Sequence, residues 1–166
     1  MSNEIFLKID DLVGDSEDKA GNAHKGEITV LGWSWGMSQT GTTHHSKGGG
    51  AGKVSINDIS FTKRADTSSH RLHQSCCDGT HFKQAIFTMR KAGGKDPLEF
   101  VKIELSDLIV SSITASISPE SETLIENVTL NFAKFKMTYN AQDTTGTALG
   151  GDLVAKWDIP GNVPEA

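Results

Sequence analysis

Residues 32–36 carry the most specific catalytic pattern in the chain. They read Gly-Trp-Ser-Trp-Gly and fit G-x-S-x-G, the nucleophile elbow of α/β-hydrolases. That elbow needs a strand before the serine and a helix after it, so that the hydroxyl stands at a strained turn. The strand is predicted here but the helix is not, and the two tryptophans suit a straight packed strand. We therefore assign no catalytic residue and keep a small serine hydrolase using Ser34 only as an alternative.

The glycine-rich segment before Lys53 is a poor phosphate loop. The pattern G-x-x-x-x-G-K-[ST] requires glycine where Lys47 stands and serine or threonine where Val54 stands. Without that hydroxyl there is no magnesium ligand, and the lysine is predicted to begin a strand rather than a helix. The match fails, and no cofactor is expected.

The histidines are not arranged as a metal site. His44 and His45 are adjacent, so their rings point apart in extended backbone and make a poor ligand pair. His70 and His73 could share a helix face, but no cysteine or carboxylate stands at convincing spacing with them. We interpret all four as surface residues and expect no metal.

Cys76 and Cys77 are the only cysteines of the chain. Neighbouring cysteines rarely form a disulfide because the ring would be strained. This cysteine usage suits a reducing compartment. We expect one of the two side chains to be buried and the other half-buried.

Length and charge exclude several classes of protein. The 166 residues form one expected domain, 1–166, which is long enough to bury a core. The formal charge of -5 provides no basic field for a phosphate backbone, so nucleic-acid binding is not expected. No apolar run is long enough to span a membrane, and the first ten residues lack the pattern of a Sec signal peptide.

The longest strand signal, residues 126–139, is the expected centre of the fold. Val128, Leu130 and Phe132 alternate with polar or small residues, and the apolar phase then slips by one to Phe135 and Met137. Because side chains alternate between faces, the slip predicts either a β-bulge near residues 133–134 or two packing partners in succession, one on each side. Either interpretation makes this a central strand.

The other segments also favour a mainly β fold. Further strands are predicted at residues 5–9, 27–37, 53–63, 81–91, 98–105, 108–117 and 153–159. In the second of these, Leu31, Trp33, Trp35 and Met37 are expected to share one face. A single helix is predicted at 68–78, capped by Ser68 or Ser69 and ended by Gly79. The pattern suggests a barrel or sandwich.

Taken together, these features resemble the Hcp family, the haemolysin-coregulated tube proteins of bacterial type VI secretion systems. The resembling segments keep a consistent order along nearly the whole chain; they are residues 32–39, 50–53, 60–63, 90–94, 110–112 and 126–133. The departures are local and include the His44-His45 pair and the Cys76-Cys77 step.

The resemblance implies a mainly β fold, an antiparallel β-barrel of two sheets with one short α-helix packed alongside. It implies homohexameric rings that stack into a tube, which a contractile sheath propels and a spike of the valine-glycine-repeat family caps. The tube would carry secreted effectors in its lumen. The protein would begin in the bacterial cytoplasm and reach the extracellular space or a target cell without a Sec signal peptide.

Residues 38–52, rich in Gly, Ser, Thr and His, predict a long exposed loop. We expect this loop to dock onto the next ring, since glycine permits backbone conformations that other residues resist. The expected stacking residues are Thr40, Thr42, Thr43, His44, His45, Ser46, Lys47, Gly48, Gly49 and Gly50. The polar turn with Ser116, Ser118 and Glu120 is the expected lumen surface. A tail-tube-like β-barrel protein outside secretion remains a second alternative.

Overall fold

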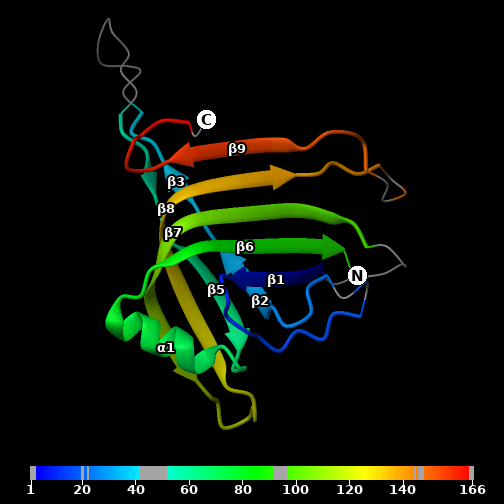
Figure 1. Ribbon diagram of the computed structural model, residues 1–166, viewed down its shortest axis with the longest axis vertical. Coiled ribbons are helices and arrows are strands. Elements are labelled where there is room, and N and C mark those ends of the chain that lie inside the picture. Colours follow the sequence, from blue (N-terminus) through cyan, green and yellow to red (C-terminus); the bar gives the residue numbers. More distant parts are fainter. Residues whose placement is uncertain are drawn as a thin grey trace, which may run out of the picture.

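The computed structural model describes residues 3–19, 21, 23–41, 52–91, 97–143, 145 and 148–164. Within these ranges the chain forms nine strands and one helix (Figure 1). They are β1 (Asn3–Ile9), β2 (Ile28–Ser34), β3 (Met37–Ser38), β4 (Ser55–Ile56), β5 (Ile59–Arg64), α1 (Ser69–Asp78), β6 (Phe82–Lys91), β7 (Glu99–Ser116), β8 (Ile125–Tyr139) and β9 (Leu153–Asp158).

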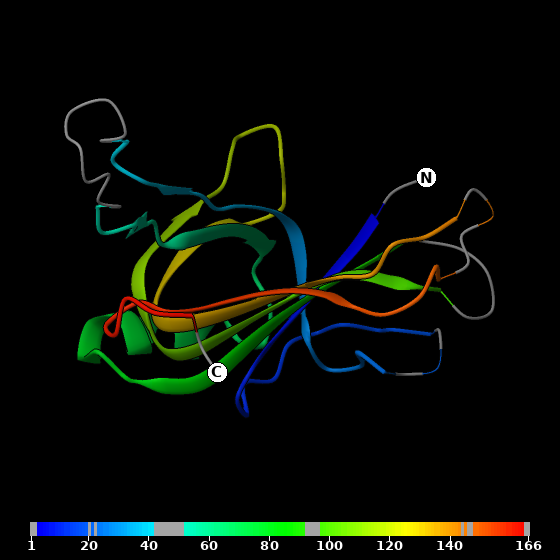
Figure 2. The same cartoon turned by 90° about the horizontal axis from the view of Figure 1, so that it is seen from above.

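The strands confirm the predicted antiparallel barrel. The main sheet has the order β5-β2-β1-β6-β7-β8-β9, and an additional pairing of β5 with β8 closes it, with β9 outside the closed ring. β3 and β4 form a separate two-stranded sheet. Because β7 and β8 are long and curved (Figure 2), the closed sheet has two layers, β2-β5-β8-β7 and β1-β6-β7-β8-β9.

The two layers meet at a bend that crosses three neighbouring strands in register, which we call the fold line. Gln84 of β6 pairs with Ser106 of β7, and Ser106 pairs with Lys134 of β8. These three residues form a row across the sheet. In each strand, the nearest buried residue before the row and the nearest one after it are three positions apart, which would put them on opposite faces of a flat strand. All of them nevertheless face the core: Phe82 and Ala85, Leu105 and Leu108, Phe132 and Phe135.

Two aspartates stand at the fold line. Asp107, next to Ser106, has a φ of 53°, a left-handed conformation that aspartate tolerates better than most residues. Asp10, with a φ of 39°, directs its carboxylate at β6. The amides of Lys83 and Gln84 donate to its two oxygens at 2.8 and 2.9 Å. Asp10 thereby supplies acceptors to β6 just beyond the point where its pairing with β1 ends.

The fold line accounts for the phase slip in a way that neither interpretation foresaw. A bulge near residues 133–134 is wrong, since the register with β7 is continuous there and shifts only between Val110 and Ser112. β8 does have two successive partners, β5 and then β9, but both pair with the same edge of β8. The expectation of one packing partner on each side is wrong, because Phe132 and Phe135 face one core. The predicted break between 105 and 108 is also wrong, because β7 runs through its bend as one strand.

β2 departs from its predicted faces. Its register with β5 shifts between Val30 and Gly32, so a bulge falls at Leu31. Leu31 is exposed, whereas Trp33 packs against the core. The expectation that these two residues share a face, together with Met37 of β3, is therefore wrong, since one extra residue reverses the alternation.

Helix α1 is confirmed, beginning one residue later than predicted, and it packs against β7 with Leu72 fully buried. Gly79 ends it in the left-handed conformation, but Ser68 makes no side-chain cap. Instead, the fully buried Lys63 of β5 bonds to Glu126 at 2.6 Å and to Ser69 at 3.1 Å, fastening the start of the helix to the barrel.

The cysteines are more exposed than predicted. Cys76 is half-buried and Cys77 is exposed, and neither forms a disulfide. Cys77 follows Cys76 by about 100° around the helix, which turns it away from the contact with β7.

Among the described residues, no helix is long and apolar enough to cross a membrane.

The fold line generates a prediction about Asp10. Asp10→Asn preserves a residue that tolerates positive φ but removes the charge and one acceptor, so we expect a loss of about 1–2 kcal/mol in the free energy of unfolding, measured by urea denaturation. Asp11→Asn is the control, since Asp11 is exposed and makes only a 3.5 Å ion pair with Arg71. Equal effects of the two substitutions would contradict this role of Asp10.

Candidate functional site: a hydroxyl-lined sheet face

Small neutral polar side chains cover the middle of the outer face of the layer β2-β5-β8-β7. Directly paired residues share a face, and one such row runs Ser34, Ser60, Thr129, Ser112. The next row begins at Gly32 and continues through Thr62 and Asn127 to Thr114. We call the following set the hydroxyl face: Gly32, Ser34, Ser60, Thr62, Ser111, Ser112, Thr114, Asn127, Thr129 and Asn131.

Period-two alternation produces this face. In β5, Ile59, Phe61 and Lys63 are buried, so Ser60 and Thr62 point outward. In β8, Val128 and Leu130 are likewise fully buried between outward polar residues. One side of these strands builds the core, while the other side presents mainly hydroxyl and amide groups, with the paired Arg64 and Ile125 at one end of the face.

Hydrogen bonds across the strands hold much of the face in place. The Thr62 hydroxyl donates to Asn127 Oδ1 at 2.8 Å. The hydroxyls of Ser111 and Ser112 lie 2.7 and 2.6 Å from Thr129 Oγ1. Ser111 also donates to Asp58 at 2.6 Å. The lateral bonds order these side chains while the hydroxyl oxygens retain further acceptor capacity.

Gly32 leaves a hollow in this face. A Cβ atom at Gly32 would meet nothing within 4 Å. The resulting shallow depression, of about 350 Å³, includes Ser34, Ser60, Thr62 and Asn127 in its lining. It therefore has hydrogen-bonding groups on several sides and no charged group among its lining residues.

The layer ends in two open strand edges among the described residues. On one side, β1 pairs with β2 only at Ile28 and Thr29, so residues 30–34 have no partner beyond β5. On the other side, β6 pairs with β7 no further than Leu108, which leaves residues 109–116 paired with β8 alone. Backbone donors and acceptors on open edges can add a further strand.

Ser34 lies within this face and not at a nucleophile elbow. It is the last residue of β2, and strand β3 follows after only two residues, so the required helix is absent at this position. His70 and His73 are exposed on α1, as expected. In the described part of the chain, no three His, Cys, Asp or Glu residues are grouped as metal ligands.

The other predicted site residues adjoin the face or lie elsewhere. Ser116 is exposed at the end of β7, and Ser118 and Glu120 are exposed in the connection to β8. Thr40 is exposed, whereas residues 42–50 of the expected stacking loop lie outside the described residues. Sequence reasoning missed the hydroxyl face, whose only signal was the Ser, Thr and Asn residues alternating with apolar ones in residues 59–62 and 127–131.

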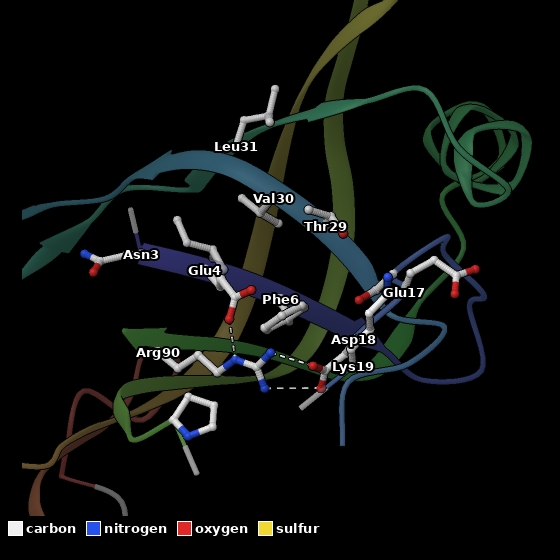
Figure 3. A pocket seen from close by; sticks show the side chains of 13 residues that line it. Asn3, Glu4, Phe6, Glu17, Asp18, Lys19, Thr29, Val30, Leu31 and Arg90 are labelled. Atoms are coloured by element: carbon white, nitrogen blue, oxygen red, sulfur yellow. Dashed lines mark hydrogen bonds and ion pairs between the residues drawn. The ribbon is translucent and has the colours of Figure 1, made fainter. Parts of the chain in front are cut away.

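A second hollow, of about 540 Å³, lies between residues 16–19 and strands β1 and β2 (Figure 3). At its base, the Arg90 guanidinium donates to both carboxylate oxygens of Asp18 and to Glu4. The bonds with Asp18, followed by those with Glu4, raise the pKa of Arg90 above its already high ordinary value. Arg90 is thus a permanent cation that is fully paired.

Comparisons with known proteins agree with this architecture. Residues 6–139 match a family model described as type VI secretion system effector, Hcp. The chain is 45% identical over 163 residues to protein hcp1 of Pseudomonas aeruginosa, covering 98% of this chain and 99% of that protein.

Solved structures give the same relationship. The crystal structure of Hcp1 from Salmonella typhimurium superposes with a TM-score of 0.81 at 37% identity, covering 99% of this chain and 100% of that one. The structure of a type six secretion system protein superposes with a TM-score of 0.89 at 25% identity, with the same coverage.

Proposed function

Since the chain belongs to the Hcp family of type VI secretion proteins, we propose that it assembles into hexameric rings that stack into a tube and carry effectors in the lumen. Members of this family are structural tube proteins rather than known enzymes. The observation that carries the proposal is the hydroxyl face bounded by two open edges. A four-stranded layer of this kind is suited to continue into a copy of itself.

The two open edges provide the two different patches that a ring requires. A ring forms through a heterologous interface, in which one surface of a subunit meets another surface of the next. The edge of β2 at residues 30–34 and the edge of β7 at residues 109–116 lie at opposite sides of one layer. Pairing β2 of one subunit with β7 of the next satisfies both edges and produces a continuous cylinder of strands.

The hydroxyl face would then form the wall of the lumen. Its neutral side chains can remain hydrated and can exchange bonds with water or with a passing protein. Ser116, Ser118 and Glu120 adjoin this face and would contribute at its rim. Effectors would be held by many weak contacts with six equivalent walls, so multiplicity would supply the affinity.

The loop of residues 38–52 would connect successive rings. Its base is anchored, since Met37 pairs with Ile56, Ser38 pairs with Ser55, and Trp35 Nε1 donates to the Asn57 carbonyl at 3.0 Å. A loop on a fixed base reaches a defined place on the neighbouring ring. Ordering the loop costs entropy, so each contact would be weak and the six together would stabilise the stack.

In this proposal the completed tube has three kinds of partner. A contractile sheath surrounds and propels it, a spike of the valine-glycine-repeat family caps it, and effectors occupy it. The subunit would leave the bacterial cytoplasm within the expelled tube, so its export would need no Sec signal peptide. Export can be checked by immunoblotting culture supernatants from cells with and without a functional sheath.

Disulfide trapping tests the proposed ring interface. In a background with Cys76→Ser and Cys77→Ser, Ser34→Cys on β2 is combined in turn with Ser112→Cys, Thr114→Cys or Ser116→Cys on β7. Since a cylinder of strands is staggered by its shear, we expect one of the three combinations to give, on oxidation, a ladder that ends at six subunits in non-reducing electrophoresis.

The matched control places cysteines on exposed positions of the other layer, with Val154→Cys on β9 and Lys8→Cys on β1. This pair should give no ladder above background. A six-subunit ladder from the control, with none from the three test combinations, would assign the ring interface to different edges.

Deleting residues 42–50 tests the stacking role of the loop. The deletion leaves both open edges of the hydroxyl-faced layer intact, so rings should form with the mass of six subunits by light scattering. Tubes should be absent from negative-stain images because the contacts between rings are removed. Tubes of normal length in the deletion variant would refute the stacking role.

Arginine substitutions test the cargo surface. Thr62→Arg places six cations around the proposed lumen wall, so recovery of a co-purified effector should fall about tenfold or more, while ring mass stays unchanged. Ser118→Arg in the β7–β8 connection is the comparison and should reduce recovery less. A larger loss of effector recovery with Ser118→Arg than with Thr62→Arg would place the main cargo contact on the β7–β8 connection rather than on the hydroxyl face.

A further inference from the structure

The connection between β1 and β2 lies on the outside of the barrel, and we call its described residues, 11–19, 21 and 23–27, the strap. Its two arms are tied by backbone bonds: Gly14 donates to Gly26 at 2.8 Å, and Ser16 donates to Glu27 at 3.0 Å. Gly14 is required at this crossing, because a Cβ atom there would lie 2.4 Å from the Glu27 carbonyl oxygen. The two arms of the strap are therefore held close together near β2.

The strap is attached to the barrel through Asp18 and His24. Asp18 binds Arg90 of β6 and accepts the backbone N–H of His24 at 3.0 Å. The His24 ring is stacked on Phe6 of β1, with centroids 4.6 Å apart and an interplanar angle of 7°. Its Nε2 lies 2.7 Å from Glu99 at the start of β7. These contacts link the strap to three strands of one layer.

Both ring nitrogens of His24 face carboxylates. Nδ1 lies 2.9 Å from Glu27 Oε2 within the strap, and Nε2 contacts Glu99. A neutral imidazole has one N–H donor and one acceptor, and an ionised carboxylate can only accept. Two such contacts are satisfied together only when both ring nitrogens carry protons.

The ionised side chains in these contacts are the carboxylates of Glu4, Asp18, Glu27 and Glu99 and the guanidinium of Arg90, which lies 4.7 Å from the centre of the Phe6 ring. Arg90 pairs with Asp18 and Glu4, whereas Glu27 and Glu99 are the two carboxylates that contact the His24 ring. Loss of that proton would leave a nitrogen lone pair directed at a carboxylate oxygen.

We propose that His24 is a proton-operated latch that holds the strap closed when doubly protonated and releases it when the ring loses a proton. The strap residues 16–19 and the β2 residues 29–31 line the same hollow, beside the open edge of β2 (Figure 3). Release of the strap would therefore loosen the docking place of the neighbouring subunit. The effect on the neighbouring subunit rests on the proposed ring, whereas the latch itself does not.

The latch is tested by trypsin cleavage after Lys19 and Lys25, both exposed in the strap. Cleavage rates are divided by those of a free peptide of residues 15–29 at each pH. Because imidazole changes charge in this range, the wild-type ratio should rise about tenfold or more between pH 6 and pH 9. A wild-type ratio independent of pH would overturn the proposal.

Two substitutions separate the latch from general loosening. Glu27→Gln provides an amide that can donate to the unprotonated ring nitrogen, so its ratio should stay low across the pH range. His24→Gln should give a high ratio that does not change with pH. His73→Gln, at an exposed histidine on α1, should behave as the wild type. A rise in the Glu27→Gln protein equal to that of the wild type would refute the role of His24.

Ring mass by light scattering at pH 6 and pH 9 tests whether release of the strap weakens the contact between subunits. Wild-type rings should be more stable at pH 6, so they should persist to lower protein concentrations at pH 6 than at pH 9. The Glu27→Gln protein should show no such difference. Rings of unchanged stability alongside a working latch would refute only the coupling to assembly. Absence of rings at both pH values would contradict the proposed function and leave the latch supported by proteolysis.

Discussion

The fold line across β6, β7 and β8 is the constraint on which the rest of the structure depends. Each of these strands must bury residues on both sides of the bend, although they stand three positions apart. The strands can do so only by bending together, because a slip in one strand alone would disrupt its pairing with the next. The register through Gln84, Ser106 and Lys134 shows that they bend together.

From this bend follow the two layers and their edges. The far half of β7 leaves β6 behind and reaches beyond it with one side unpaired, while the first half of β8 joins β5. The hydroxyl face is the outer surface of the layer formed in this way. Its exposure and its free edge on β7 are thus consequences of core packing on the opposite side of the same strands.

Buried cations attach the two non-strand elements to the barrel. Lys63 is fully buried and binds Glu126 beside the start of α1, and Arg90 binds Asp18 beneath the strap. Such pairs contribute little net stability because desolvation opposes their attraction, but removing one partner leaves a buried charge. Their geometry therefore fixes where the helix and the strap sit on the barrel.

Much of the fold could be predicted from single segments, but the site could not. The alternation in residues 126–139 identifies β8, and Leu72 followed by Gly79 identifies α1. The phase slip at Phe132 and Phe135 was visible, yet its cause lies in matching slips in two other strands, and register between strands is absent from local patterns. Ser34, Ser60, Ser112 and Thr129 become neighbours only in the sheet, and His24 looks like any polar loop residue.

The hydroxyl face also has a mechanical consequence. A protein moving past a row of fixed charges meets deep wells and high barriers, whereas serine and threonine hydroxyls rotate and serve as donor or acceptor at nearly equal energy. Each bond broken on such a surface is replaced by a similar bond one row further along, two residues away on the same strand. In the proposed tube the face would thus be a smooth track with low friction, on which cargo would be retained at rest and still slide when pushed.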